Sequence, residues 1–412
     1  MATGRFFGWR VVWAAFVLAA FGWGVGFYGP PIYLHALVER NGWPVSLVSA
    51  AVTVHFLVGA VVVANLPALY RRYGVPRVTK AAAMALGLGV CGWAWAQAPW
   101  HLFAATLLSG AGWVAMSAAA VNAIVSPWFD RGRPVALATA YNGASIGGVV
   151  FSPLWVAAIG YLGFLQAAIL VAIVMTAVIW LLADRLFSKI PDAMGLRPDG
   201  PASRDTAPAA LSALPSQPLP RALLWRDRRF VTLAAGMALG LFAQIGLLAH
   251  LFSLLVPPLG PQFAGLAMAL ATAAAIAGRM LGGWVLTFGL DRRLVSAGSY
   301  GIQIAACLLF VLSAGHSVPL LLLGVLLFGS GIGNATSLPP LIAQTDFSKA
   351  DVARVVALIV AIAQAGYAFA PAAFGVIREV SAGAGSANVP LVFIAAALIQ
   401  ASAAFCFLAG RK

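Results

Sequence analysis

Long apolar runs separated by short polar segments extend along the whole chain. A bilayer core of about 30 Å needs about 20 helical residues at about 1.5 Å each. The first run is too long to be the core of a cleaved secretory signal. The pattern predicts an all-α polytopic membrane protein whose twelve transmembrane helices lie approximately at residues 11–37, 46–69, 77–97, 101–125, 135–159, 163–183, 230–255, 263–288, 294–314, 317–342, 353–377 and 389–409.

The basic residues support this number of helices. With twelve spans, alternate connecting segments lie on the same side as the N-terminus, and those segments hold 22 of the 25 Lys and Arg residues. The opposite segments hold only Arg40 and Arg378, and Arg279 lies inside a span. Because Lys and Arg gather on the cytoplasmic side of membrane proteins, both termini are expected to be cytoplasmic, in an inner or plasma membrane.

Composition excludes a water-soluble globule. Hydrophobic residues make up 62% of the chain and charged residues 9%, against about 25% charged in soluble domains. The net charge of +14 would suggest nucleic-acid binding in a soluble domain, but here the basic residues lie between apolar runs, so no nucleic acid is expected. The three cysteines lie inside apolar runs, so neither a disulfide, a metal site nor a cofactor is predicted.

The chain divides into two halves of equal length. Residues 185–228 contain seven prolines and no long apolar run, which predicts a solvated cytoplasmic linker. Residues 127–153 match 345–371 in length and align Phe129 with Phe347 and Pro153 with Pro371. We therefore predict two pseudo-symmetric six-helix bundles, 1–184 and 229–412, in parallel orientation.

These features together resemble the major facilitator superfamily. They include the two halves, the long basic central loop and the segment Trp128-Phe129-Asp130-Arg131-Gly132-Arg133 between helices 4 and 5. The resemblance implies a central substrate cavity between the halves and transport by alternating access. The family has a sequence motif in the loop between helices 2 and 3, and an acidic residue of that motif corresponds to Arg71 in this chain. The cytoplasmic gate is therefore expected to be altered or built from other residues, and its candidates are Arg71, Arg72, Asp130, Arg131, Arg133 and Asp291.

Within that family, three segments resemble the monocarboxylate and oxalate/formate branch: residues 21–28, Gly42-Trp43-Pro44 and Gly278-Arg279. In that branch an arginine of helix 8 binds the substrate carboxylate, and Arg279 occupies the matching position. Ala275 fills the position of that branch's aspartate, and helix 11 has no internal cation. A singly charged substrate is therefore expected rather than a doubly charged one.

The charges inside the spans lead to the same expectation without the family. Arg279 lies twelve residues before Asp291, about 18 Å along a helix, whereas none of the eleven acidic residues lies deep within a span. A guanidinium stays protonated, so an anionic substrate bound by two parallel hydrogen bonds would compensate it. The alternative is a structural Arg279 that extends to the interface or binds helix-end carbonyls.

Other polar and aromatic residues near mid-span are candidates for substrate contact, because amides and hydroxyls donate to carboxylates and aromatic rings enclose apolar groups. Interhelical hydrogen bonds are their alternative use. The candidates are Tyr28, Trp113, Tyr141, Asn142, Gln244, Asn334, Gln364 and Tyr367. For proton coupling the candidates are His250 and His55. The alternative is that the proton is cotransported with the substrate acid and needs no dedicated residue.

The predicted function is secondary transport of a small organic anion, a monocarboxylate, by proton symport or anion exchange. The alternatives are transport of a neutral or amphipathic metabolite or drug with Arg279 structural, and a non-transporting receptor of the same fold. An enzyme is not expected. Gly143-Ala144-Ser145-Ile146-Gly147 fits a hydrolase pattern, but it lies inside a predicted helix, where small residues serve close packing.

Overall fold

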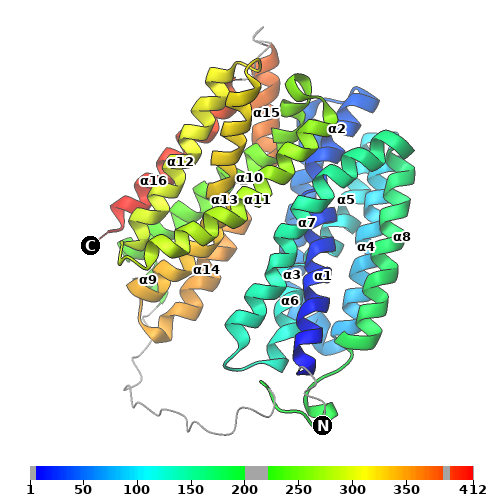
Figure 1. Cartoon of the computed structure of the whole chain (residues 1–412), viewed down its shortest axis with the longest axis vertical. Helices are drawn as coiled ribbons and strands as arrows, with labels where there is room; N and C mark the ends of the chain where they lie inside the picture. Colours follow the sequence, from blue (N-terminus) through cyan, green and yellow to red (C-terminus); the bar gives the residue numbers. More distant parts are fainter. Residues whose placement is uncertain (1–5, 200–220, 384–389, 412) are drawn as a thin grey trace. The chain divides into compact units, whose positions relative to one another are not determined.

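The computed structural model describes residues 6–199, 221–383 and 390–411, and all regular structure in these ranges is helical (Figure 1). The middle of the predicted linker, 200–220, lies outside the described residues. The helices are α1 (Phe7–Gly26), α2 (Pro30–Asn41), α3 (Val45–Tyr73), α4 (Val75–Trp95), α5 (Pro99–Val114), α6 (Ala118–Val125), η1 (Ser126–Trp128), α7 (Arg133–Leu162), α8 (Phe164–Leu182), η2 (Ala183–Phe187), η3 (Asp192–Met194), α9 (Arg221–Leu224), α10 (Arg228–Leu259), α11 (Pro261–Leu286), α12 (Arg292–Ser313), α13 (Val318–Asp346), α14 (Lys349–Tyr367), α15 (Ala370–Gly383) and α16 (Pro390–Ala409).

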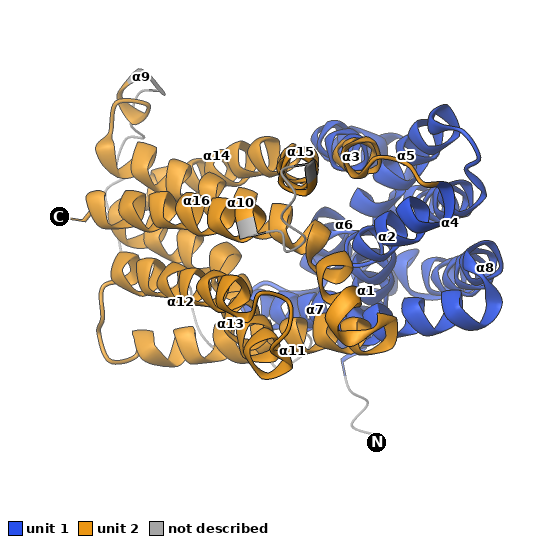
Figure 2. Ribbon diagram, turned by 90° about the horizontal axis from the view of Figure 1, so that it is seen from above, with its two compact units in different colours: residues 1–41, 54–211 blue, residues 42–53, 212–412 orange. Residues whose placement is uncertain are grey.

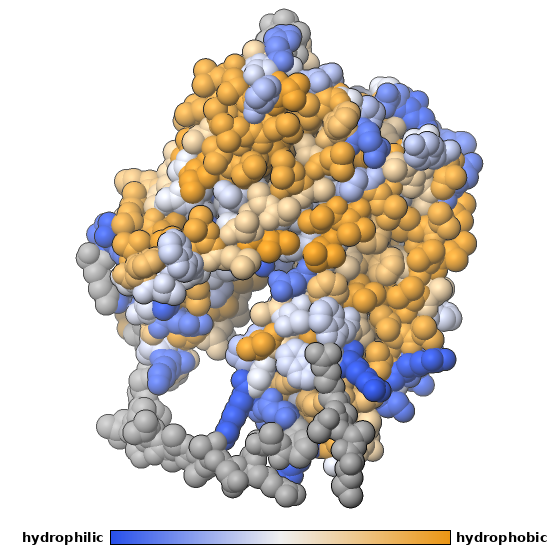
Figure 3. All heavy atoms as spheres, in the orientation of Figure 1, coloured by the Kyte–Doolittle hydropathy of each residue, from blue (hydrophilic) through white to orange (hydrophobic). Residues whose placement is uncertain are grey.

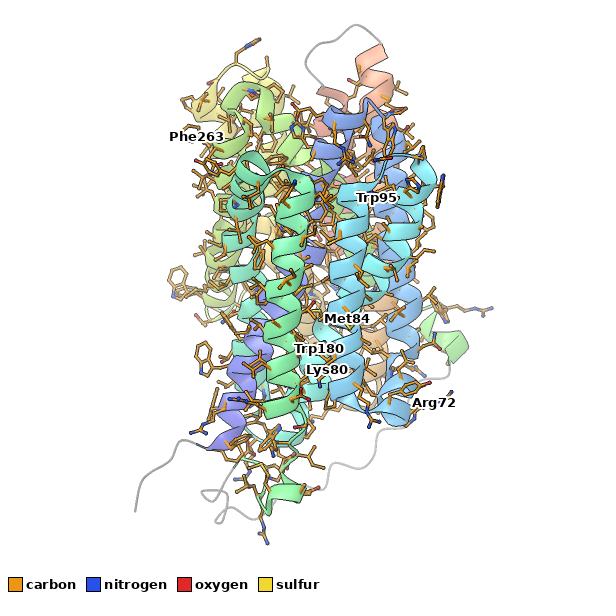
Figure 4. The ribbon with its side chains drawn as sticks, turned by 90° about the vertical axis from the view of Figure 1, so that its right-hand side faces the viewer. Arg72, Lys80, Met84, Trp95, Trp180 and Phe263 are labelled. Carbon is orange, nitrogen blue, oxygen red and sulfur yellow. The ribbon has the colours of Figure 1, made fainter. Side chains whose placement is uncertain are left out.

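Twelve helical segments of the described chain are long and apolar enough to cross a membrane. This confirms the predicted all-α class and the number of spans. Figure 3 shows broad areas of apolar side chains on the surface of the protein. On the face of unit 1 seen in Figure 4, Trp95 lies toward one end, Met84 lies between, and Arg72 lies toward the other end. Trp95 is 52% exposed and Met84 42%, as expected for side chains that face lipid.

The chain forms two compact units (Figure 2). Unit 1 comprises residues 1–41 and 54–211, and unit 2 comprises residues 42–53 and 212–412. Residues 42–53 belong to unit 2 because the first turns of α3 bind α15. Glu379 Oε1 accepts a hydrogen bond from the Ser46 backbone N–H at 2.9 Å, and Thr53 Oγ1 accepts one from Ala372 at 3.1 Å.

Glycines allow two helices of unit 1 to touch backbone to backbone. A Cβ atom on Gly143 of α7 would lie 2.0 Å from the carbonyl oxygen of Phe16 on α1, and one on Gly147 would lie 2.4 Å from that of Ala20. Neither position accepts a larger side chain without a shift of one helix. The sequence Gly143-Ala144-Ser145-Ile146-Gly147, which fits a hydrolase pattern, thus forms part of the surface by which α7 packs against α1.

The predicted helix 1 is broken into α1 and α2 at residues 27–29. Pro30 has no N–H, so the Gly26 carbonyl has no donor four residues further along, and the Tyr28 N–H bonds the Trp23 carbonyl at 2.8 Å instead of that of Gly24. Three side chains of unit 1 supply replacements: Trp155 Nε1 donates to Gly24 O (3.3 Å), Tyr33 Oη to Val25 O (3.1 Å) and His55 Nε2 to Gly26 O (2.9 Å). The break is therefore fully hydrogen-bonded at these three carbonyls.

Two further predicted spans are also interrupted. Helix 4 divides into α5 and α6, where Met116 and Ser117 bond the carbonyls three residues earlier at 3.1 Å. Helix 11 divides into α14 and α15 at residues 368–369, shortly before Pro371. In the second case, proline has no N–H to donate to the carbonyl of Tyr367, the last residue of α14.

Close packing of α11 on α13 organises unit 2. A Cβ atom on Gly278 would lie 1.9 Å from the carbonyl oxygen of Ser330, and one on Gly329 would lie 2.3 Å from that of Ala271. The line of contact between these two helices, which we call the α11–α13 seam, carries Arg279. The fold thereby holds the arginine's backbone against a neighbouring helix.

Candidate substrate-binding residues

Arg279 lies on the α11–α13 seam with its side chain half-buried. Its Nε donates to the carbonyl oxygen of Gly333 at 3.4 Å, and the same oxygen accepts from Ser337 Oγ at 3.0 Å. A Cβ atom on Gly333 would lie 3.1 Å from the Cβ of Arg279. A glycine at 333 therefore leaves room for the first atoms of the arginine side chain.

Asn334 lies beside this position on α13 and is 8% exposed. Its Nδ2 donates to the carbonyl oxygen of Gly278 at 3.3 Å, and its Oδ1 has no hydrogen-bond partner among the described residues. The structure thus brings two of the predicted binding residues, Arg279 and Asn334, to one short stretch of the seam.

Gln244 lies inside unit 2, only 3% exposed. Its Nε2 donates to Gln303 Oε1 at 2.9 Å, and Gln400 Nε2 donates to the same oxygen at 3.2 Å. Sequence reasoning did not single out Gln303 or Gln400, although both are polar residues inside apolar runs. Together the three glutamines join α10, α12 and α16 by buried hydrogen bonds.

Two predicted residues lie where α14 ends. Gln364 and Tyr367 are half-buried in its last turn, directly before the interruption that precedes α15. An interrupted helix exposes polar groups at membrane depth, which is common where membrane transporters bind their cargo.

In unit 1, five aromatic rings gather at the break between α1 and α2. Trp113 lies at the centre, with its ring centroid 5.6 Å from that of Trp23, 5.9 Å from that of Phe27 and 6.2 Å from that of Phe56. The Tyr28 centroid lies 5.1 Å from that of Phe27. We call these five residues the aromatic cluster. Only Tyr28 and Trp113 were predicted, because the other rings join through contacts that spacing alone does not reveal.

Tyr141 on α7 bonds the interrupted helix 4. Its hydroxyl donates to the carbonyl oxygen of Ala118 at 3.2 Å and accepts from Asn122 Nδ2. Asn142, the next residue, is exposed on α7. Asn122 is also exposed and was missed by the sequence reasoning.

Both candidate histidines are buried and hydrogen-bonded. His55 Nδ1 lies 2.9 Å from Ser109 Oγ, in addition to the bond from its Nε2 to Gly26. His250 Nε2 lies 3.0 Å from the carbonyl oxygen of Pro371, whereas its Nδ1 has no partner in the described part of the chain. Of the two rings, His250 has the nitrogen that is open to a further partner.

Three predicted gate residues of unit 1, Asp130, Arg131 and Arg133, lie in or directly after a loop that binds Asp199 of the linker. Asp130 Oδ1 is 3.2 Å from Arg133 NH2, while Arg71 and Arg72 are exposed in the last turn of α3. The Asp199 carboxylate accepts from the backbone N–H groups of Asp130 (3.1 Å), Arg131 (2.8 Å) and Gly132 (3.1 Å).

Partial burial alone would raise the pKa of Asp199, but these backbone donors, with the positive charge of Arg131, outweigh it and lower the pKa. Asp199 was not predicted, since nothing in the sequence links a linker residue to this loop.

The candidate gate residue of unit 2, Asp291, caps the N-terminus of α12. Its Oδ1 accepts from the backbone N–H of Arg293 at 2.8 Å, and its Oδ2 lies 2.7 Å from Arg411 Nε. Burial acts to raise the pKa of Asp291, but the hydrogen bond and charge of Arg411 and the backbone donors reverse this effect and lower it.

Near Asp291, Arg293 is 3% exposed and binds Asp346 Oδ2 at 2.9 Å. No cluster of three or more metal-binding side chains occurs among the described residues.

Comparison with known proteins agrees with this architecture. Residues 12–371 match the model of the Major Facilitator Superfamily. The chain therefore belongs to this superfamily: it is a membrane transporter of the secondary, alternating-access class and not an enzyme. No curated protein matches the sequence significantly.

Several solved transporters share the fold. The nucleoside transporter NupG has a TM-score of 0.74 at 14% identity, covering 98% of this chain and 99% of that one. A bacterial homolog of the human lysosomal transporter Spinster has a TM-score of 0.70 at 14% identity, with coverages of 100% and 98%. A D-xylose-proton symporter has a TM-score of 0.69 at 14% identity, with coverages of 98% and 97%. At these identities the likeness concerns the fold alone.

Proposed function

We propose that this protein transports a small organic anion, a monocarboxylate in the first instance, and that Arg279 binds the carboxylate. The observation that carries this proposal is the position of Arg279, a half-buried guanidinium inside a span and beside the buried amide of Asn334. The described acids lie in loops or near the ends of spans. A fixed cation inside a span is costly unless it serves binding or conduction, and a carboxylate matches the planar guanidinium.

Within unit 1, the aromatic cluster remains a candidate for contact with apolar groups. Aromatic rings provide large apolar surfaces at low conformational cost. Tyr28 and Trp113 belong to this cluster, whereas Tyr141, Asn142, Gln364 and Tyr367 remain candidates for polar contacts. Gln244 is the weakest of the set, because its amide is already used inside unit 2.

For energy coupling we propose proton symport or anion exchange. If a side chain carries the proton, His250 is favoured over His55, because only His250 has a ring nitrogen without a partner among the described residues. Both termini are proposed to lie on the cytoplasmic side, where Arg71, Arg72, Asp130, Arg131, Arg133 and Asp291 would contribute to the gate.

A neutral or amphipathic substrate is the second candidate, and the pair formed by Asn122 and Tyr141 favours it. This pair places uncharged polar side chains, bonded to each other and to the Ala118 carbonyl, close to exposed surface of unit 1. In that case Arg279 would be structural, with its bond to the Gly333 carbonyl as its main role.

Ligand-dependent thermal stability distinguishes the two candidates. The purified protein would be heated with monocarboxylates, dicarboxylates, nucleosides, sugars and organic cations, because a ligand of the folded state raises the melting temperature. We expect monocarboxylates to stabilise the protein and Arg279→Lys to weaken their apparent affinity at least tenfold. Arg77→Lys, at an exposed residue in the first turn of α4, is the control. Stabilisation by sugars or nucleosides that Arg279→Lys leaves unchanged would refute anion binding by Arg279.

A further inference from the structure

Unit 2 contains a cavity of about 690 Å³ where α10, α12, α15 and α16 approach the loop between α12 and α13. This volume lies in the range of small-molecule sites, about 300–1,000 Å³. By the alternation of the spans, the loop lies on the side of the membrane opposite the termini. Most of the wall is apolar, and its principal side chains are Leu254, Leu255, Phe310, Val311, Leu321 and Phe393.

Arg378 of α15 provides a positive charge in this apolar wall. One guanidinium NH group donates to Ser253 Oγ, and that hydroxyl itself donates to the carbonyl oxygen of His250 at 2.9 Å. No carboxylate of the described chain lies within 4.0 Å of Arg378. The adjacent Glu379 is engaged elsewhere, because it accepts from the Ser46 N–H. Two of the three guanidinium nitrogens of Arg378 have no bond to a described residue.

Arg40 shows what an arginine with a structural role looks like on the same side of the membrane. Its NH1 and NH2 groups donate to the carbonyl oxygens of Ala94 and Ala96, and its Nε donates to Asn41 Oδ1 at 3.0 Å. All three nitrogens are therefore used by the protein. Arg378, by contrast, retains donors at the wall of a cavity.

Other polar groups of the cavity can assist an anionic ligand. Ser313 and His316 are the polar residues of the wall besides Ser253 and Arg378. The Ser313 hydroxyl already donates to the carbonyl oxygen of Phe310 at 2.7 Å, so of these two residues the His316 ring is the group left for a ligand. Pro257 and Pro258 lack N–H groups, so the carbonyls of Ser253 and Leu254 have no donor four residues further along α10. These carbonyls are acceptors for a hydroxyl group of a ligand.

We propose that this cavity binds a molecule that joins one carboxylate or phosphate to an apolar chain. Arg378 binds the anion with its remaining N–H groups, and the half-buried ring of Phe393, whose centroid lies 5.0 Å from that of the buried Phe310, packs against the chain. A membrane lipid with an anionic headgroup and a soluble amphipathic acid share this chemistry. The site lies apart from Arg279 and does not depend on the proposed transport substrate.

The test measures the melting temperature of the full-length protein, purified in neutral detergent, against phosphatidylglycerol, phosphatidylcholine, octanoate and inorganic phosphate. We expect phosphatidylglycerol, octanoate or both to stabilise the protein more than the other two probes. Stabilisation by phosphatidylglycerol but not by octanoate would identify the ligand as a membrane lipid. Stabilisation by octanoate would identify it as a soluble acid. Equal stabilisation by phosphatidylcholine, or stabilisation by inorganic phosphate alone, would contradict the proposal.

Three variants make the test specific. Arg378→Gln is expected to raise the half-saturating probe concentration at least tenfold, whereas the control Arg40→Gln leaves it within twofold. Val311→Trp fills the cavity without removing the guanidinium and is expected to abolish the effect as well. Arg279→Gln separates this site from the transport site, because the stabilisation must survive that substitution. An effect that persists in Arg378→Gln, or that Arg40→Gln weakens equally, would overturn the proposal.

Discussion

His55 lies in a chain of buried hydrogen bonds that closes the break in the first span. Trp93 Nε1 donates to Ser109 Oγ at 3.0 Å, and the serine hydroxyl in turn lies 2.9 Å from His55 Nδ1. Because the Gly26 carbonyl only accepts, His55 Nε2 must carry hydrogen, and Nδ1 is then the acceptor from Ser109. A neutral ring thus satisfies both partners.

We therefore expect His55→Leu to destabilise the protein by about 2 kcal/mol, because it leaves the buried Gly26 carbonyl without this donor and the buried Ser109 hydroxyl without its 2.9 Å acceptor. Equilibrium unfolding in mixed micelles measures the change. Asn65→Ala on the same helix is the control, since Asn65 is exposed and bonds only the carbonyl of Val61. Equal stability of His55→Leu and the control would contradict this role.

Asp199 gives a second prediction at the scale of the residue, and it depends on pH. The folded-state pKa of Asp199 is lowered, so its stabilising effect is complete above the unfolded value of about 3.9 and is lost as the pH falls through the folded value. At neutral pH we expect Asp199→Ala to accelerate amide hydrogen exchange at residues 130–132, which donate to its carboxylate.

The difference in exchange between Asp199→Ala and the wild type should become smaller as the pH falls below the range in which aspartate usually titrates, because the wild-type carboxyl is then protonated. Asp192→Ala is the matched control, because Asp192 is an exposed acid in the same part of the linker. Equal exchange at residues 130–132 in the wild type and Asp199→Ala at neutral pH would show that the carboxylate does not hold this loop.

At the scale of the element, the interrupted spans differ most from expectation. Length and hydropathy predict twelve spans, since crossing a bilayer demands both. They do not predict that the first span breaks at residues 27–29, because the break is stable only when Trp155, Tyr33 and His55 reach its carbonyls from other parts of unit 1. For the same reason the sequence identified Arg279 as a charge inside a span, but not three of the five rings in the aromatic cluster.

Helix packing supplies a prediction with an internal control on α11. Gly278→Ala should destabilise the protein by about 1–3 kcal/mol, because the new Cβ would lie 1.9 Å from the Ser330 carbonyl. Gly283→Ala should be neutral or stabilising by about 0.5–1 kcal/mol, since nothing lies within 4 Å of its Cβ position and alanine favours the helix. Equilibrium unfolding of both variants checks this, and similar effects would disprove close packing at the seam.

At the scale of the whole molecule, the two units belong to one transporter family, yet their interruptions are not symmetric. The first and fourth spans are broken, whereas their counterparts by repeat, α10 and α13, run without a break. In the eleventh span the break falls at residues 368–369, while α7, its counterpart, continues through Pro153. The two halves therefore share the number and order of their spans, whereas the positions at which the spans are interrupted differ between them.

The central claim is that this transporter moves a small organic anion by means of Arg279. Uptake of a labelled monocarboxylate into proteoliposomes, driven by a pH gradient or by an anion trapped inside, tests it most directly. We expect wild-type protein to accumulate the anion and Arg279→Lys to lower the initial rate at least tenfold at low substrate concentration, with equal amounts of protein in the vesicles. Equal rates for the two proteins, or uptake of neutral solutes but of no monocarboxylate, would contradict the claim.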